Sequence, residues 1–194
     1  DKSYGFREGR NCQQAVQRAQ KYIEDGNRWV VEMDLSKFFD RVNHDILMDR
    51  VSRVIDDKAI LKLIRRYLNA GIMEDGLVSP RLEGVPQGSP LSPLLSNIML
   101  TELDRELEER GLNHVRYADD CNIYVKSEKA AQRVLTNITK YVEGTLKLRV
   151  NRDKSGTFRP RDSVFLGYTF SKANCTRIIV AQKSVKRLWT KLHK

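Results

Sequence analysis

The spacing of hydrophobic residues changes several times along the chain, and each change marks a different predicted element. Apolar residues recur every three or four positions in five segments, which we therefore predict to be helices. These segments are residues 12–26, 44–55, 57–71, 94–111 and 128–145. Alternation with a period of two predicts a strand over 28–35 and a hairpin over 114–127. The pattern therefore predicts a chain that combines helices with a small number of strands.

Two stretches lack a sustained helical spacing. Residues 71–93 are punctuated by Gly, Pro and Ser, which predicts turns and a hairpin. Residues 146–182 contain short β-like pieces broken by polar clusters, which predict a small sheet or paired hairpins. The helix after the first stretch has Pro93 near its start and an apolar stripe from Leu94 to Leu107, so we expect it to pack in the core.

The composition favours a folded protein that binds polyanions. With 194 residues and 40% hydrophobic side chains, the chain is long enough to bury a sizeable core. Lys and Arg number 35 against 25 Asp and Glu, which gives a formal net charge of +10 and makes nucleic acid the expected partner. On charge alone, a basic protein that binds no polyanion stays an alternative.

Cysteine usage and hydropathy indicate the compartment. The three cysteines are odd in number and lack the paired spacing of a zinc site or a disulfide framework, so we expect a reducing, cytoplasmic location. No apolar run approaches the roughly 20 residues that a membrane-spanning helix needs, so no membrane association is expected. The chain starts without Met and ends within a cationic run, and we expect it to be a fragment of a longer protein.

Three aspartates are the candidate catalytic groups. Asp119 and Asp120 stand side by side in "HVRYADDCNIYV", and Asp34 ends the strand predicted over 28–35. Clustered carboxylates repel each other, and two Mg²⁺ ions would resolve that conflict and drive phosphoryl displacement. Adjacent strand residues point to opposite faces, so we expect Asp119 to bridge the ions and Asp120 to bind more peripherally. The alternative for "ADD" is an ordinary solvated hairpin turn.

A second candidate lies in "VPQGSPLSPLLSNIML". It places Gln87 and Gly88 just before a helix, where free backbone N–H groups and an amide can meet a phosphate or a nucleotide. An ordinary Pro-Gly turn is the alternative.

With "MDLSKFFD", "PQGSPLSPLLSNIML" and "RYADD" in this order, the chain resembles reverse transcriptases, most closely those encoded by bacterial group II introns. "SYGFREGRNCQQAV" is similar to a fingers motif of these enzymes, with Glu8 in place of a proline. "LRVNRDKSG" and "FLGYTF" resemble the segment that contains the family's active-site lysine and the start of its primer-grip hairpin. The resemblance covers nearly the whole chain.

The resemblance implies an α+β fold, the fingers and palm of a right-hand polymerase, with a small antiparallel palm sheet backed by helices. Residues 1–9 and 42–91 would form the fingers. Residues 10–41 and 92–181 would form the palm with its primer-grip hairpin, and residues 182–194 would begin the thumb.

The resemblance also implies roles for individual residues. Asp34, Asp119 and Asp120 match the metal-binding triad, with the Leu35 carbonyl as a further metal contact. Phe39 matches the aromatic residue that stacks under the deoxyribose and excludes a 2′-hydroxyl. The remaining matches are Gln87 for the incoming nucleotide, Arg7 or Arg10 for its triphosphate, Lys154 beside the acids, and Leu166, Gly167 and Tyr168 for the primer terminus.

Each role has a plainer alternative. Phe39 would otherwise be a core aromatic, although Phe38 is the expected core member of the pair. The arginines and Lys154 would otherwise be solvated surface charges, and residues 166–168 would pack within a small sheet.

The expected function is RNA-directed DNA synthesis with two Mg²⁺ ions, on an RNA template, a DNA primer and dNTPs. Intron RNA is a further expected partner, and a homodimer is left open. One alternative is an RNA-binding maturase fragment that is inactive as a polymerase. Another is a CRISPR-associated or retron-type reverse transcriptase.

Overall fold

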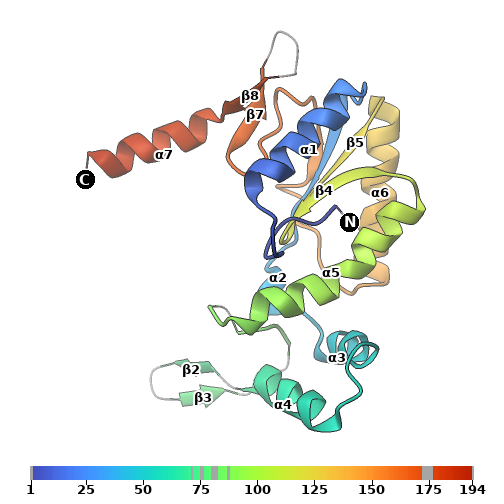
Figure 1. The fold of residues 1–194 in the computed structure, drawn as a ribbon, viewed down its shortest axis with the longest axis vertical. Helices are drawn as coiled ribbons and strands as arrows, with labels where there is room; N and C mark the ends of the chain where they lie inside the picture. Colours follow the sequence, from blue (N-terminus) through green and yellow to red (C-terminus); the bar gives the residue numbers. More distant parts are fainter. Residues whose placement is uncertain are drawn as a thin grey trace.

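The computed structural model describes residues 2–70, 72–74, 77–79, 83–86, 88–171 and 177–193 (Figure 1). The helices are α1 (Cys12–Glu24), α2 (Phe38–Arg41), α3 (His44–Ser52), α4 (Lys58–Asn69), α5 (Leu91–Glu109), α6 (Glu128–Gly144) and α7 (Gln182–Leu192). The strands are β1 (Trp29–Met33), β2 (Ile72–Glu74), β3 (Leu77–Ser79), β4 (Asn113–Tyr117), β5 (Asp120–Val125), β6 (Gly156–Phe158), β7 (Tyr168–Phe170) and β8 (Ile178–Val180). All five predicted helices, the first strand and the hairpins are confirmed.

A four-stranded antiparallel sheet in the order β4-β5-β1-β6 forms the centre of the molecule. Central β1 places Val31 opposite Ile123 of β5 on one side and Thr157 of β6 on the other. Tyr117 pairs with Asp120, so the β4–β5 hairpin closes through two residues, Ala118 and Asp119. Asp120 is therefore the first residue of β5 rather than part of the turn.

Two helical layers cover the sheet, and the alternation within β1 explains both. Val31 and Met33 belong to the larger core, which includes Leu103 of α5 and Ile138 of α6. Val30 points the other way, into a smaller core that includes the buried face of α1. Figure 1 shows α1 and α6 on opposite sides of the strands. Full burial of an aliphatic side chain contributes roughly 1.5–3 kcal/mol, so both layers fix the sheet.

The apolar face of α5 differs from the predicted stripe. Leu95, Met99, Leu103 and Leu107 are buried, whereas Leu94 is 57% exposed. Buried residues spaced by four form one face of a helix, and Leu94 lies about 100° away from that face. Its prediction as a core residue was wrong.

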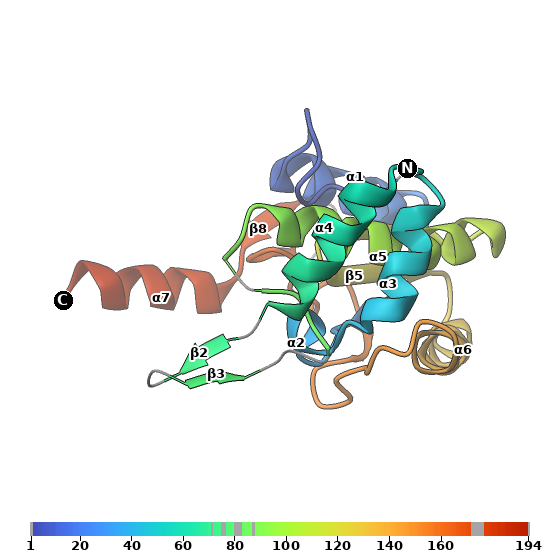
Figure 2. The same ribbon diagram turned by 90° about the horizontal axis from the view of Figure 1, so that it is seen from below.

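Helices α3 and α4 pack on each other at one end of the sheet: Arg50 of α3 reaches Met99 in the middle of α5, whereas Tyr67 of α4 bonds Ser92 near the start of α5. Figure 2 shows the β2–β3 hairpin next to α4. Residues 83–86, on the way from β3 to α5, pack beside α2. The Gly84 N–H donates to the Val42 carbonyl (2.7 Å), and the Val85 N–H donates to the Phe39 carbonyl (2.6 Å). His44 Nε2 lies 2.7 Å from the Gly84 carbonyl and must donate, because a carbonyl only accepts. These bonds hold α2 against the 83–86 segment.

At the other end, α7 projects away from the sheet (Figure 1). None of its residues is buried, and Val185, Leu188, Trp189 and Leu192 are exposed. The segment expected to begin the thumb, residues 182–194, forms a helix from Gln182, whereas the fingers, palm and thumb boundaries stay predictions. No helix in the described part of the chain has the length and apolar character to cross a bilayer.

Candidate active site

Strands β1 and β5 bring the three aspartates to one end of the sheet. Met33 pairs with Cys121, so Asp34 follows the last residue of β1 while Asp119 and Asp120 precede Cys121. The backbone of Asp34 is fixed from a distant segment: its N–H donates to Ser155 Oγ (3.0 Å), and its carbonyl accepts from the Asn151 N–H (2.9 Å). The position of Asp34 therefore depends on both the sheet and the 151–155 turn.

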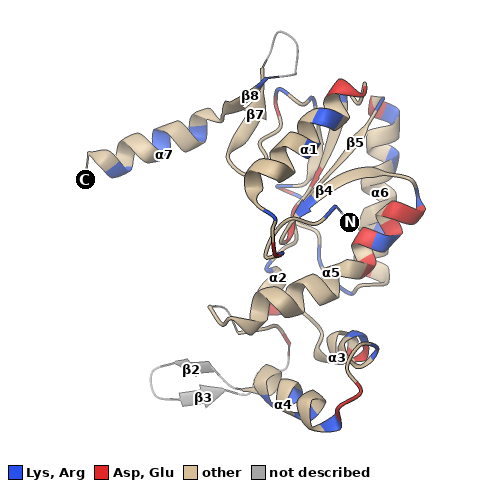
Figure 3. Cartoon of the chain, viewed as in Figure 1, with Lys and Arg blue, Asp and Glu red and all other residues tan. Residues whose placement is uncertain are grey.

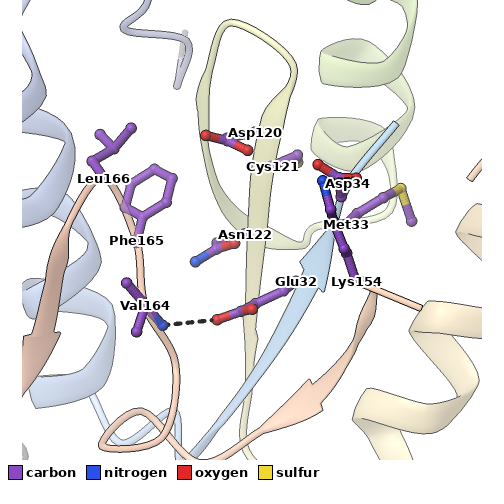
Figure 4. A pocket seen from close by; sticks show the side chains of 10 residues that line it. All are labelled: Glu32, Met33, Asp34, Asp120, Cys121, Asn122, Lys154, Val164, Phe165 and Leu166. Atoms are coloured by element: carbon purple, nitrogen blue, oxygen red, sulfur yellow. Dashed lines mark hydrogen bonds and ion pairs between the residues drawn. The ribbon is translucent and has the colours of Figure 1, made fainter. Parts of the chain in front are cut away.

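Two hollows meet at Asp34. The first, about 380 Å³, is lined by Asp34, Leu35, Phe39, Asp119 and Lys154 among others. The second, about 190 Å³, is lined by Glu32, Asp34, Asp120, Asn122, Lys154 and Leu166 among others (Figure 4). Asp119, in the turn, and Asp120, the first residue of β5, thus line different hollows.

The nearby cations do not fully neutralise the negative charge of the three aspartates. Burial, followed by the neighbouring Asp119 and Asp34, raises the pKa of Asp120 from 3.8 to about 6. Burial and then Asp34 also raise the pKa of Asp119. Lys154 Nζ lies 3.8 Å from Asp34 Oδ2 and opposes both shifts, but its side chain is 70% exposed. The site would therefore be stabilised by protons or by a bound cation.

Glu32 adds a fourth carboxyl group behind the aspartates. It accepts a hydrogen bond from the Val164 N–H (3.0 Å), drawn in Figure 4. Burial raises the pKa of Glu32, and hydrogen bonds from Ser163 and Val164 partly offset that rise. Glu32 therefore adds a carboxyl group to the two aspartates, Asp34 and Asp120, that line the second hollow.

The oxygen donors fit Mg²⁺ held in part by its substrate. Among the residues that the structure describes, no three His, Cys, Asp or Glu side chains converge on one metal position. Mg²⁺ usually keeps several waters and binds through one or two carboxylates plus substrate phosphates, rather than through an all-protein cage. Asp34 and Asp119, which share the first hollow, supply such a pair of carboxylates.

Phe39 lies between two hollows. It borders the first one and a third, apolar hollow of about 440 Å³ that also contains Phe6 and Pro90. Phe38 is only 2% exposed and packs edge-on against Phe39, with ring centroids 5.3 Å apart. Of the two rings, Phe39 is the one available to a ligand. Gln87, predicted to contact a nucleotide, lies outside the described residues.

The predicted arginines are not brought to these hollows. Arg10 donates to the Ser3 carbonyl (2.6 Å) and lies 5.3 Å from the centre of the Tyr4 ring. Burial, together with nearby Arg116, lowers the pKa of Arg7. Neither side chain lines any of the three hollows described above.

The three residues predicted to contact the primer, Leu166, Gly167 and Tyr168, have different surroundings. Leu166 lines the second hollow. The Gly167 carbonyl accepts from Ala181 N–H (2.9 Å) and Ser184 Oγ (3.2 Å), which ties this segment to the start of α7. Tyr168 begins β7 and packs against the smaller core beside α1.

Several site residues were not anticipated, although local signals exist for some. Glu32 has the same strand parity as Asp34, and Asn122 has the same parity as Asp120, so the period of two places each pair on one face. The bonds of Ser155 and Asn151 to Asp34 have no such local signal, since they join segments far apart in the chain.

The antiparallel sheet with helices on its faces has the fingers-palm fold of right-hand polymerases. Residues 1–170 match the family model described as reverse transcriptase (RNA-dependent DNA polymerase), and the chain belongs to that family. The family generally uses divalent metal ions.

Relatives agree with the family assignment, and a solved structure agrees with the fold. Protein YkfC of Escherichia coli is 36% identical over 205 residues, which cover 86% of this chain and 54% of YkfC. Group II intron-encoded protein LtrA of Lactococcus lactis is 39% identical over 105 residues, 54% of this chain and 17% of LtrA. The chain thus spans about half of YkfC. The structure of telomerase from Candida albicans, in complex with a TWJ fragment of telomeric RNA, superposes on this chain with a TM-score of 0.72. The superposition covers 93% of this chain and 35% of the telomerase chain, and at 15% identity it shows the fold alone.

Proposed function

We propose that this chain is the fingers and palm of an RNA-directed DNA polymerase that joins dNTPs to a primer by two-metal nucleotidyl transfer. The observation that carries the proposal is the meeting of Asp34 with Asp119 in one hollow whose wall includes Phe39. The family match supports the reaction class.

In this proposal Asp34 and Asp119 hold Mg²⁺, with the Leu35 carbonyl beside them and Asp120 at the periphery. Two bound ions would activate the primer 3′-hydroxyl and stabilise charge on the leaving pyrophosphate. The protein contributes positioning: Ser155 and Asn151 fix the backbone of Asp34, and the hairpin turn fixes Asp119.

Phe39 would set the sugar specificity. It borders the hollow of the acids and is less buried than Phe38, so a ribose 2′-hydroxyl would meet the ring. Lys154, next to Asp34, would offset charge on the acids or the triphosphate. We keep Gln87 as a nucleotide contact, Arg7 and Arg10 as fingers cations, and Leu166, Gly167 and Tyr168 as primer contacts.

Basic helices would hold the template and the primer. Helix α4 carries four Lys or Arg residues and no acid, and so does α7; Figure 3 shows them at separate ends of the molecule. Contacts to phosphates release counterions, so binding should weaken steeply as salt rises. The likeness to LtrA supports an origin in a group II intron-encoded protein. Action in the cytoplasm and binding of intron RNA are further parts of the proposal.

Primer extension on poly(rA)/oligo(dT) with Mg²⁺ tests the proposal. We expect extension by the wild-type chain, loss of extension in Asp119→Ala, and retention in the matched control Asp56→Ala, whose side chain is exposed in the loop before α4. Binding of RNA without extension by the wild-type chain would refute polymerase activity and favour an RNA-binding maturase fragment.

A further inference from the structure

We propose that Arg116, Asn97 and Asp104 form a buried positioning device that holds the metal-binding hairpin turn and seats the N-terminal loop against it. The catalytic meaning of the device rests on the proposed function, whereas its structural effect does not. Arg116 lies on β4 with 0% exposure, and Asn97 and Asp104 lie on α5 with 5% and 7%.

All three guanidinium nitrogens of Arg116 donate hydrogen bonds. Nε donates to Asp104 Oδ1 (2.8 Å) and Nη2 donates to Asp104 Oδ2 (2.5 Å), a bidentate pair. Nη1 donates to Asn97 Oδ1 (3.0 Å) and to the carbonyl of Ala118 (2.7 Å). Ala118 is the first residue of the turn and immediately precedes Asp119. A lysine has no planar fork and cannot reproduce these directions.

Asn97 extends the network to the N-terminal loop. Its Nδ2 donates to the Gly5 carbonyl (3.0 Å). Gly5 packs so closely on the hairpin that a Cβ there would lie 2.3 Å from the Ala118 nitrogen. The Tyr4 N–H donates to the Arg116 carbonyl (2.8 Å), and the Arg116 N–H donates to the Lys2 carbonyl (3.0 Å). Three segments therefore meet at Arg116: the hairpin, α5 and the loop that continues to Phe6.

The turn needs this external support. Ala118 has a φ of 56°, a left-handed conformation that costs a residue with a Cβ roughly 1–2 kcal/mol. The turn has only two residues, so the position of the Ala118 carbonyl bears directly on the backbone of Asp119. A buried ion pair is weak evidence for stability, because well-packed apolar residues often replace one at no cost. The hydrogen bond from Arg116 to the Ala118 carbonyl indicates that the device fixes the geometry of the hairpin turn.

The test compares matched substitutions on one helix. Asn97→Ala removes the link from Arg116 to Gly5 and leaves the ion pair intact. Ser96→Ala, its control, also loses a buried side-chain hydrogen bond, but that bond goes to Ser92 within α5. Arg116→Lys is matched by Arg110→Lys, since Arg110 pairs with Glu106 at the surface end of α5.

Two readouts do not depend on activity. Mn²⁺ binding in the presence of dTTP and primer-template is measured by electron paramagnetic resonance, and hydrogen exchange is followed over residues 113–124. Groups that orient metal ligands typically contribute 10–100-fold in metal affinity. We expect Mn²⁺ binding about 10–100-fold weaker in Asn97→Ala and Arg116→Lys. We also expect faster exchange at the turn in both, with both controls like wild type.

Folded Asn97→Ala protein with the Mn²⁺ affinity and turn exchange of Ser96→Ala would overturn the inference. If the single variants unfold, the double variant Asp104→Leu, Arg116→Met replaces the ion pair with an apolar pair of similar volume. Normal Mn²⁺ affinity in that folded double variant would also overturn the inference. Wild-type protein that binds Mn²⁺ but extends no primer refutes the polymerase and leaves the positioning result standing. Wild-type binding no tighter than that of Asp119→Asn refutes the metal site, and the turn exchange of Asn97→Ala against Ser96→Ala then decides the positioning inference.

Discussion

Gly84 is the position where one added methyl group should most disturb the relation between Phe39 and the acids. It lies in the loop that precedes α5, buried against α2, and its φ is +85°. A Cβ at this position would lie 2.7 Å from the Phe39 carbonyl oxygen and 2.7 Å from the Asp40 carbonyl carbon and oxygen. All three are backbone atoms, so no side-chain rotation relieves the contact.

Two contributions set the size of the effect of Gly84→Ala. The left-handed backbone costs a residue with a Cβ roughly 1–2 kcal/mol. Overpacking against fixed backbone costs typically about 1–3 kcal/mol more. Their sum, about 2–5 kcal/mol, is a large part of the roughly 5–15 kcal/mol by which folded proteins are stable. Relief of the clash would also shift α2, and with it the Phe39 ring.

Gly26→Ala separates the two contributions, because Gly26 has a φ of +92° and no atom lies within 4 Å of the place that a Cβ would occupy there. We expect urea unfolding to show a loss of roughly 1–2 kcal/mol for Gly26→Ala, from the backbone alone. The loss for Gly84→Ala should exceed it by about 1–3 kcal/mol. Equal losses in the two variants would refute the claim that close contact with α2 excludes a side chain at Gly84.

Three further predictions concern the site. Asp120→Asn should raise the free energy of unfolding by about 1 kcal/mol or less at pH 7.5 without metal, because this carboxyl is partly exposed and screened. Burial raises the pKa of Asp120 in the folded protein to about 6, so the folded protein takes up this proton at a higher pH than the unfolded chain does. The stability of the wild-type protein therefore rises as pH falls from about 6 towards 4, and the advantage of Asp120→Asn over wild type should vanish near pH 4. Destabilisation by Asp120→Asn at pH 7.5 contradicts this. Ser155→Ala should cost about 1–2 kcal/mol in urea unfolding by leaving the Asp34 N–H without its partner, and an unchanged midpoint would count against that bond. Phe39→Val should increase ribonucleotide incorporation relative to dNTPs by about 10-fold or more, in line with the roughly 1–3 kcal/mol at stake in fitting or excluding a small group; unchanged discrimination in primer extension would remove Phe39 from sugar selection.

Local patterns predicted the elements of this fold well. The period of two in 28–35 and 114–127 predicted β1 and the β4–β5 hairpin, because a strand's pattern depends only on its own residues. The order of the motifs implied that Asp34 and Asp119 share a site, and the structure places both in one hollow. Their role as metal ligands stays a prediction.

Partners distant in the chain escaped the sequence reasoning. No local pattern distinguishes Arg116 from a surface charge, since charged residues are almost never fully buried unless paired, and the sequence does not show that Asp104 lies opposite. The reverse held for Leu94, which has the right residue type for the core but faces away from it. Arg10 is engaged by Ser3 and Tyr4 rather than lining the hollows of the acids.

The bond between Asp34 and Ser155 also has a consequence for synthesis on the ribosome. The two residues are 121 positions apart, and at roughly 5–20 residues per second the ribosome needs about 6–24 s to reach Ser155 after Asp34. Until residue 125 has been made, β1 lacks both of its neighbouring strands, and for the rest of that interval it still lacks β6 and the complete 151–155 turn. A nascent chain of this protein is therefore most exposed to aggregation, and most in need of a chaperone, before residue 155 has emerged.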